Sequence, residues 1–160
     1  MLEVQGFGGA VVTPHVMSTQ AGVAALARGG SAADAAIAAN AVQGVVAPET
    51  CGIGGDLFAL VHDGTGVSAL NSSGWAGSNA SAAALREDGL TAIPQHHPAA
   101  VTIPGCVAGW FELHDRHGRL PMGELLAPAI ALGREGFPAS TEYSRATTRM
   151  ARFLSEHEQG

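Results

Sequence analysis

The sequence predicts an α+β fold that is rich in helix and contains one β-hairpin. The apolar run at residues 57–61 and the shorter run at 67–70 are separated by the turn-forming residues Asp63-Gly64-Thr65-Gly66, which indicates two antiparallel strands. Segments with helix-start and helix-stop signals lie on both sides of this hairpin. Long stretches of small residues, alanine and glycine above all, predict close packing between these helices.

The stretch 50–61 joins a small-residue helix to the first strand of the hairpin. Its glycines, Gly52, Gly54 and Gly55, leave space that side chains cannot fill, so we expect a strand, a helix or a ligand to approach this backbone closely. A phosphate-binding loop follows a strand and opens a helix, whereas this loop follows a helix and opens a strand, which argues against a nucleotide site. Residues 57–61 are apolar throughout, which predicts a central strand buried on both faces.

Before this stretch, residues 9–12 have the pattern of a first strand, and Thr13 followed by Pro14 predicts a capped helix start. Gly29-Gly30 ends that helix. Ser31-Ala32-Ala33-Asp34 resembles a capping box, with aspartate at the fourth position. The helix that it opens should run to about residue 46, before Pro48, and be buried nearly all round.

After the hairpin, the pattern alternates loops with helices, and one short strand is predicted at residues 101–103. Residues 71–79 form a Ser/Gly/Asn loop that carries Trp75, and His96-His97-Pro98 forms a second loop. Pro128 is expected to restart a helix at a first-turn position. The predicted helices are residues 80–85, 107–117, 120–136 and 143–154.

Composition excludes several classes of function. Charged residues make up 14% of the chain, below the roughly 25% of a typical protein, which suggests that much of the surface faces further protein. The net charge of −6, with scattered arginines as the only basic residues besides histidine, argues against a nucleic-acid partner. No apolar run approaches the length of about 18 residues that spans a membrane. Residues 1–5 lack a secretory signal, which predicts a cytoplasmic location, or a periplasmic or secreted one if the true start lies upstream.

The chain shows no convincing set of catalytic or metal-binding residues. Cys51 and Cys106 lack metal-ligand spacing and are expected to be reduced core thiols, with one bridge as the alternative. Cys106 at a helix start is the better nucleophile of the two, but its apolar neighbours indicate a buried position. His114 and His117 share a helical face without a third ligand, and no Gly-x-Ser-x-Gly elbow is present. We therefore expect no metal and no cofactor.

Five motifs follow one another in a fixed order between about residues 8 and 140. They are Ala21-Gly22 through Gly29-Gly30-Ser31-Ala32-Ala33-Asp34-Ala35-Ala36; Gly52-Ile53-Gly54-Gly55-Asp56-Leu57-Phe58; Asn71-Ser72-Ser73-Gly74; Pro104-Gly105-Cys106-Val107-Ala108-Gly109; and Pro128-Ala129-Ile130 to Gly136-Phe137-Pro138. In this order they resemble the N-terminal part of the gamma-glutamyltranspeptidases, which are N-terminal-nucleophile hydrolases. The resemblance implies that residues 1–160 are an incomplete domain of a large subunit, forming part of an αββα sandwich.

The resemblance also implies a reaction and its partners. In that family a precursor cuts itself before a threonine, whose hydroxyl becomes the nucleophile and whose new amine serves as base. The family places this threonine and the oxyanion hole in a small subunit beyond this chain, so no catalytic residue is expected here and the fragment alone should be inactive. The implied partners are the remainder of the large subunit, the small catalytic subunit and a γ-glutamyl or related acyl amide substrate. The implied context is glutathione metabolism.

The substrate-binding residues implied by the resemblance are Ser73, Gly74 and Trp75. The residue after Ser72-Ser73-Gly74 is typically an arginine that pairs with the α-carboxylate of the glutamyl group, but this chain has Trp75. An indole offers a single donor and cannot replace a bidentate clamp. The alternatives are therefore an acylase in which Trp75 lines an apolar acyl pocket, a loop in which Trp75 merely packs while another arginine such as Arg86 reaches in, and a non-catalytic remnant that binds a partner through its sheet.

Overall fold

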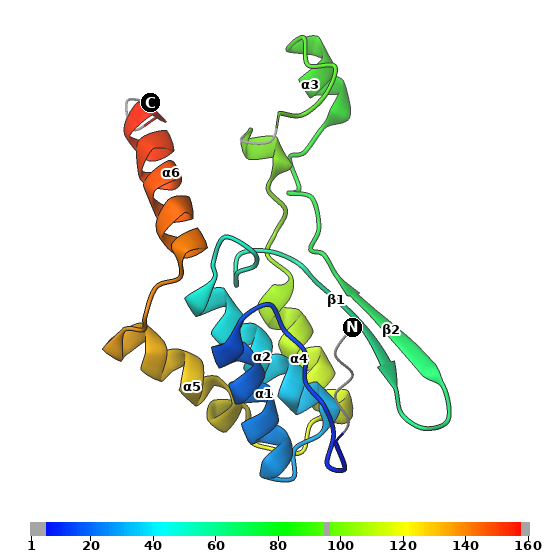
Figure 1. Ribbon diagram of the computed structural model, residues 1–160. Helices are drawn as coiled ribbons and strands as arrows, with labels where there is room; N and C mark the ends of the chain where they lie inside the picture. The colour runs from blue at the N-terminus through cyan, green and yellow to red at the C-terminus, as the bar shows by residue number, and fades with distance from the viewer. Residues whose placement is uncertain (1–5, 95–96, 158–160) are drawn as a thin grey trace. The chain divides into compact units, whose positions relative to one another are not determined.

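The computed structural model of the chain describes residues 6–94 and 97–157, and it confirms the α+β class (Figure 1). These residues group into two compact units, one comprising the chain up to Gly52 together with the chain from Glu112 onward, the other comprising Ile53–Phe111. In chain order the elements are α1 (Val16–Ala27), α2 (Ala32–Val46), β1 (Leu57–His62), β2 (Val67–Ser72), α3 (Ala82–Glu87), η1 (Pro98–Ala100, a 3₁₀ turn), α4 (Cys106–His117), α5 (Met122–Glu135) and α6 (Thr141–His157).

Helix α1 begins two residues later than Thr13-Pro14 predicts. His15 is its N-cap, and its Nδ1 accepts a hydrogen bond from the Met17 amide at 3.2 Å. The Thr13 hydroxyl donates to the His15 carbonyl oxygen at 2.8 Å instead of capping the helix. The predicted C-terminal stop is confirmed, because the helix ends at Ala27 and Gly29 adopts a positive φ of 86°.

Helix α2 is the buried centre of the first unit, and its predicted capping box is confirmed. The Ser31 hydroxyl accepts from the Asp34 amide while the Asp34 carboxylate accepts from the Ser31 amide. Gly22 allows α1 to come close, since a Cβ there would lie 3.1 Å from the Ala35 carbonyl oxygen. The buried residues of α2 are Ala33, Asp34, Ala35, Ile37, Ala38, Ala39, Ala41, Val42, Gln43 and Val46.

A chain of polar side chains crosses between α1 and the end of α2. The buried Ser18 hydroxyl donates to Gln43 Oε1 at 2.8 Å, and Gln43 Nε2 donates to the Thr50 hydroxyl at 3.1 Å. The Thr50 hydroxyl in turn donates to the Ala47 carbonyl oxygen at 2.8 Å. The buried Ser18 and Gln43 side chains thus both have hydrogen-bond partners, which stabilises the α1–α2 contact.

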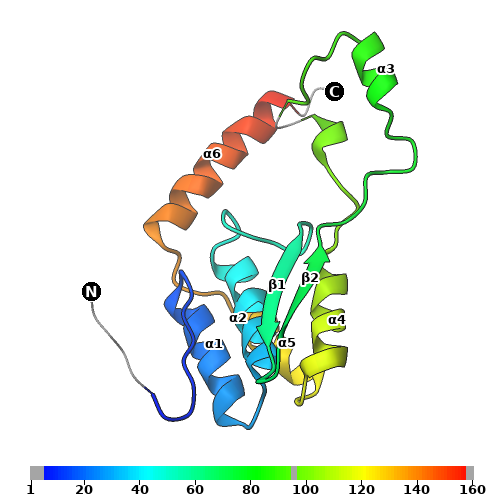
Figure 2. The ribbon, with the colours of Figure 1, turned by 90° about the vertical axis from the view of Figure 1, so that its right-hand side faces the viewer.

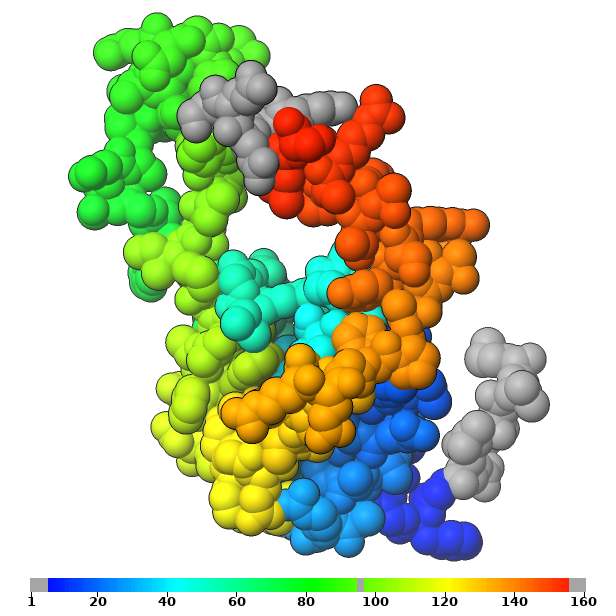
Figure 3. All heavy atoms as spheres, turned by 90° about the vertical axis from the view of Figure 1, so that its left-hand side faces the viewer, coloured from blue at the N-terminus to red at the C-terminus, as the bar shows by residue number. Residues whose placement is uncertain are grey.

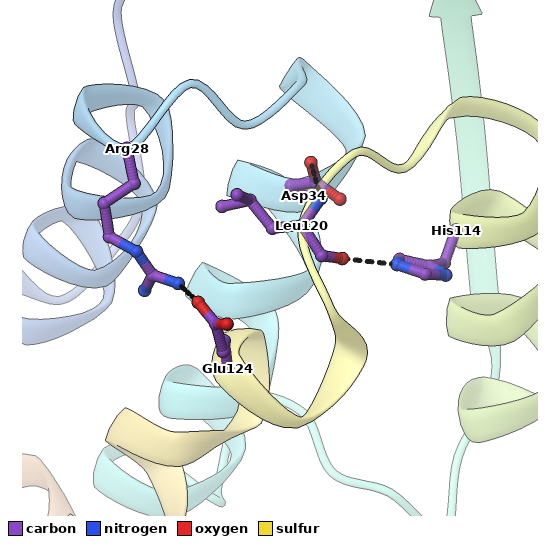
Figure 4. A network of polar contacts seen from close by, with 5 residues as sticks. All are labelled: Arg28, Asp34, His114, Leu120 and Glu124. Carbon is purple, nitrogen blue, oxygen red and sulfur yellow. Dashed lines mark hydrogen bonds and ion pairs between the residues drawn. The ribbon is translucent and has the colours of Figure 1, made fainter.

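Asp34 also holds the turn between α4 and α5 (Figure 4). Its Oδ2 accepts from the amides of Arg119 and Leu120 at 2.9 and 3.2 Å, and the side chain is fully buried. On the other side of the turn, His114 Nε2 lies 2.7 Å from the Leu120 carbonyl oxygen. An ion pair between Arg28 and Glu124 joins the end of α1 to the start of α5, and the two regions touch in the space-filling view (Figure 3).

Helix α5 is continuous through Pro128, so the prediction that this proline restarts a helix is wrong. Pro128 lies in the interior of α5, where it removes one backbone hydrogen bond. Leu125 and Ala129, on either side of it, are buried, and α5 packs against α2. We attribute the continuity of the helix to this packing, which offsets the lost bond.

The second unit contains the predicted hairpin, with β1 and β2 paired antiparallel so that Leu57 faces Ser72 and His62 faces Val67 (Figure 2). Asp63 organises the turn, because its Oδ1 accepts from the Thr65 amide, the Thr65 hydroxyl and the Gly66 amide at 2.8, 2.6 and 3.0 Å. These hydrogen bonds lower the pKa of Asp63 to about 2; the bond from the Thr65 hydroxyl contributes most, and the bonds from the Thr65 and Gly66 amides contribute less.

In the described chain β1 is covered on one face only, so the predicted burial of both faces is not seen here and stays a prediction for the complete protein. Alternate side chains of a strand point to opposite faces, and only one face is packed here. On that face a Cβ at Gly109 of α4 would lie 3.0 Å from the Leu57 side chain, so the helix lies directly against the strand. On the other face Phe58 is 64% and Leu60 is 78% exposed.

Two predicted short strands are also wrong. Residues 9–12 and 101–103 are not in strands. The sheet formed by the described residues contains only β1 and β2, and neither segment pairs with it. Of the predicted loop at residues 96–98, His96 lies outside the described residues, and Pro98 starts the 3₁₀ turn η1, capped by His97.

Candidate functional site

The candidate site is a turn after β2 that three segments of the second unit build together. The first is the glycine-rich loop before β1, the second is residues 72–75, and the third is residues 102–106, which lead into α4. The carbonyl oxygen of Gly55 accepts from the amides of Gly105 and Cys106, both at 3.0 Å. These are amides at the start of α4, where no intrahelical acceptor exists, so the glycine loop caps the helix.

Side-chain hydroxyls tie the second segment to the third. Ser72 Oγ donates to the Gly105 carbonyl oxygen at 2.7 Å, and Thr102 Oγ1 donates to the Ser73 carbonyl oxygen at 3.1 Å. The Ile103 amide donates to the Trp75 carbonyl oxygen at 2.9 Å. The backbone of residues 72–75 is therefore fixed along its length by residues 102–105.

Two glycines are required for this close approach. A Cβ at Gly105 would lie 2.1 Å from the Ser72 carbonyl oxygen, a distance that real atoms do not reach. Gly74 has a φ of +81°, and a Cβ there would lie 1.8 Å from the Ile103 carbonyl oxygen. Of the glycine loop, Gly55 makes the close backbone contact that the sequence predicts, whereas Gly54 faces open space.

The structure places Ser73, Gly74 and Trp75 together in this turn. Gly74 bends the backbone, and the Trp75 side chain that follows is 84% exposed. The amide of Ser73 donates to Asn71 Oδ1 at 3.1 Å. Arg86, the nearest arginine in sequence, lies in α3 with an exposed side chain. The turn thus presents an indole, held on a rigid backbone, where a ligand could meet it.

The arrangement can position a ligand, but it offers no activated nucleophile of its own. The hydroxyls of Ser72 and Thr102 donate to backbone carbonyl oxygens, so neither is held against a base that could take its proton. Cys106 is buried, at 3% exposure. Burial raises the pKa of the Cys51 thiol, which favours the unreactive protonated form. Neither cysteine is in a disulfide.

Of the two histidines on one face of α4, His114 has a structural contact: its Nε2 lies within hydrogen-bond distance of the Leu120 carbonyl oxygen, as described above. Among residues 6–94 and 97–157, no three His, Cys, Asp or Glu side chains lie close enough together to hold a metal ion. Within the same residues no helix is both long enough and apolar enough to cross a membrane.

Sequence reasoning did not assign a role to Thr102 or Gly105 in the turn. The signal was present, because Pro104-Gly105-Cys106 is one of the five ordered motifs, yet its partner could not be inferred from spacing. The contact joins residues about 30 positions apart, and only the fold brings them together.

Residues 18–160 match the model of the gamma-glutamyltranspeptidase family. The chain belongs to the gamma-glutamyltranspeptidase family. It is 38% identical over 148 residues to the glutathione hydrolase-like YwrD proenzyme of Bacillus subtilis, an alignment that covers 91% of this chain and 28% of that protein. It is 40% identical over 146 residues to the oxamate amidohydrolase proenzyme of Klebsiella pneumoniae, covering 87% of this chain and 27% of that protein.

A solved relative of this gamma-glutamyltranspeptidase-family chain has the same fold. The cephalosporin acylase from Bacillus halodurans superposes with a TM-score of 0.81 at 30% identity, over 98% of this chain and 32% of that one. The chain thus spans about a quarter to a third of the length of these relatives. These matches confirm the family that the five ordered motifs predict.

Proposed function

We propose that this chain is the N-terminal part of the large subunit of an amide hydrolase or acyltransferase of the gamma-glutamyltranspeptidase type. Its nucleophile would be a threonine in a small subunit, freed when the precursor cuts itself, as the resemblance implies. Two relatives named as proenzymes support this proposal. By themselves, residues 1–160 would be an incomplete domain. In the complete protein the hairpin would lie in the αββα sandwich, with its free face covered by the remaining chain.

The observation that carries the proposal is the turn at residues 72–75, fixed by Gly55, Thr102 and Gly105. Its backbone is held by hydrogen bonds and could face a ligand, and within the turn neither Ser72 nor Thr102 is held against a base; both features fit a large subunit that binds the substrate. The substrate would be an amide whose acyl group rests against Trp75. Neither a metal nor a cofactor is needed for an amide cleaved by a threonine with its own amine as base.

Trp75 favours an acyl donor without an α-carboxylate over a γ-glutamyl donor. The indole is 84% exposed and offers an apolar face with a single donor. If the remaining chain encloses this site, a carboxylate buried against the indole without a cationic partner costs about 1–3 kcal/mol, or about tenfold or more in affinity. The likeness to a cephalosporin acylase and an oxamate amidohydrolase supports an acylase-type substrate for this chain, with γ-glutamyl transfer as the second candidate.

The experiment compares the complete protein with its Trp75→Arg and Trp75→Phe variants on matched chromogenic amides that differ only in the α-carboxylate. We expect Trp75→Arg to raise kcat/KM for the carboxylated donor at least about tenfold relative to the uncharged donor, because arginine supplies the bidentate clamp. Trp75→Phe keeps an apolar ring and should leave that ratio unchanged. A parent protein that already strongly prefers the carboxylated donor, with no gain in Trp75→Arg, would contradict the assignment of Trp75.

Self-cleavage is the second readout of the proposal. Mass spectrometry of the purified complete protein should show two subunits, with a threonine at the new N-terminus. An intact, uncleaved protein that hydrolyses no amide would favour the alternative that the protein is non-catalytic and binds a partner through the hairpin.

A further inference from the structure

The side chain of Trp75 has few contacts with the described chain. The indole is 84% exposed, so its direction is determined by the backbone from which it extends. That backbone leaves β2 at Ser72 and bends at Gly74, where φ is +81°. The contacts that fix the start of the turn therefore also fix the direction in which the indole points.

Ser72 attaches the start of this turn to helix α4. Its Oγ donates to the Gly105 carbonyl oxygen at 2.7 Å, and this hydrogen bond is partly buried. The same carbonyl oxygen accepts from the Gly109 amide at 2.8 Å, a hydrogen bond of the first turn of α4. The Ser72 hydroxyl is thus the second donor to an oxygen that the helix already holds in place.

Gly105 is itself held on its other side by the loop before β1. The amides of Gly105 and Cys106 both donate to the Gly55 carbonyl oxygen at 3.0 Å. Gly105 is therefore fixed through its amide by this loop and through its carbonyl group by α4. The hydrogen bond from Ser72 joins the Trp75 turn to both of these segments.

The contact between Ser72 and α4 is close. A Cβ at Gly109 would lie 3.0 Å from Ser72 Cβ, and a Cβ at Gly105 would lie 2.1 Å from the Ser72 carbonyl oxygen. This space suits a small side chain. Alanine fits in it as serine does, so Ser72→Ala removes the hydroxyl and its hydrogen bond with little other change.

The other hydroxyl that bonds the turn is a weaker restraint. Thr102 Oγ1 donates to the Ser73 carbonyl oxygen at 3.1 Å in an exposed position, where water competes for both groups. The Ser72 hydrogen bond is shorter and partly buried, so water replaces it less readily. Of the two hydroxyls, that of Ser72 holds the turn more firmly.

We propose that Ser72 is a positioning residue for the substrate, whose hydrogen bond to Gly105 holds the turn so that the Trp75 indole meets the acyl group. The inference rests on the proposed function and assigns no chemical step to Ser72. It predicts that removal of the Ser72 hydroxyl lowers the preference for an apolar acyl group only while Trp75 is present.

The test is a double-mutant cycle in the complete protein with Ser72→Ala, Trp75→Ala and the two together. The donors are the phenylacetyl and acetyl amides of one amine, and the ratio of their kcat/KM values does not depend on the amount of folded enzyme. We expect Ser72→Ala to lower the phenylacetyl-to-acetyl ratio about fivefold in the parent and to leave it within about twofold in Trp75→Ala. Ser68→Ala removes a hydroxyl from an exposed position of the same strand and should leave the ratio unchanged.

Fluorine NMR of the protein labelled with 5-fluorotryptophan gives a readout that does not require activity. Trp75→Phe identifies the Trp75 signal, which Ser72→Ala should shift or broaden and Ser68→Ala should leave in place. Should Ser72→Ala not fold, Ser72→Cys, which keeps a weak donor, takes its place and should give a smaller change in the signal and in the ratio.

Three outcomes would overturn the inference: an unchanged Trp75 signal in Ser72→Ala, an unchanged ratio, or a fall in the ratio that is the same with and without Trp75. The last outcome would mean that Ser72 acts on the protein as a whole and not through the indole. A protein that hydrolyses neither amide contradicts the proposed function, and the fluorine spectrum then decides whether Ser72 directs Trp75.

Discussion

Replacing Asp34 with alanine should destabilise the first unit more than any other single truncation of a polar side chain in it. One carboxylate oxygen accepts from three backbone amides: Ser31 at 2.9 Å, Arg119 at 2.9 Å and Leu120 at 3.2 Å. The side chain has no solvent exposure, so water does not replace the lost acceptor. The substitution thus removes a helix cap and a link between segments 85 positions apart at the same time.

The magnitude follows from these contacts. Loss of the cap costs about 1 kcal/mol, and each buried amide left without an acceptor costs about 1–3 kcal/mol. Relief of the buried carboxylate offsets part of this, the more so because Asp34 Oδ1 is buried without a hydrogen-bond partner among the described residues. We expect a net loss of about 2–5 kcal/mol in the free energy of unfolding. Ser31→Ala, which removes only the reciprocal cap bond, should cost about 1 kcal/mol.

Urea unfolding of the parent, Asp34→Ala, Asp34→Asn and Ser31→Ala proteins measures these differences. Asp34→Asn keeps an acceptor oxygen and should lie between the parent and Asp34→Ala. Amide hydrogen exchange adds a local readout, because Arg119 and Leu120 should lose protection in Asp34→Ala and keep it in Ser31→Ala. Stability of Asp34→Ala within about 0.5 kcal/mol of the parent, or unchanged exchange at both amides, would refute the reasoning.

Three further predictions concern the second unit. Gly105→Ala should destabilise the protein by about 1–3 kcal/mol in thermal unfolding, because its Cβ would lie 2.1 Å from the Ser72 carbonyl oxygen. Gly77→Ala is the control and should be neutral, because a Cβ at Gly77 would meet open space. Equal effects of the two substitutions would contradict the close approach at Gly105. The Asp63 carboxyl should titrate near pH 2 by NMR, below its ordinary pKa of 3.8. Its stabilisation of the turn is therefore fully present above pH 3.8 and is lost as the pH falls through about 2. A measured pKa at the ordinary value would contradict the hydrogen bonds of this turn. Leu60→Ala should change the free energy of unfolding of residues 1–160 alone by less than about 0.5 kcal/mol, because Leu60 is exposed there. In the complete protein the same substitution should cost about 2–5 kcal/mol. Equal small effects in both proteins would show that this face of β1 stays uncovered.

The candidate site is only partly accessible to sequence reasoning. The resemblance singled out Ser73, Gly74 and Trp75, which are consecutive in the chain and lie in one turn, and their role in binding stays a prediction. The residues that hold this turn, Thr102 and Gly105, were visible only as members of a motif. Their role depends on a contact between distant segments, and nothing in the local pattern of either segment specifies its partner.

The sequence by itself determined the features that depend on near neighbours. The capping box of Ser31 and Asp34, the stop at Gly29 and the turn at Asp63 all lie within hydrogen bonds that span at most a few residues, so their residue types suffice to predict them. Helix and hairpin boundaries came out close for the same reason, and the order of five such local motifs was enough to indicate the family.

Only the tertiary structure decided which predicted features find a partner. Residues 9–12 have a strand pattern but find no strand to pair with in the part of the chain that the structure describes. His15 rather than Thr13 caps α1, and the Thr13 hydroxyl donates to the His15 carbonyl oxygen instead. An apolar run identifies a strand but not whether both of its faces are covered, and Phe58 and Leu60 lie on a face that the described chain leaves open. Asp34 shows the reason most directly: its cap is local, whereas its bonds to Arg119 and Leu120 exist only because packing brings a distant turn to the same oxygen.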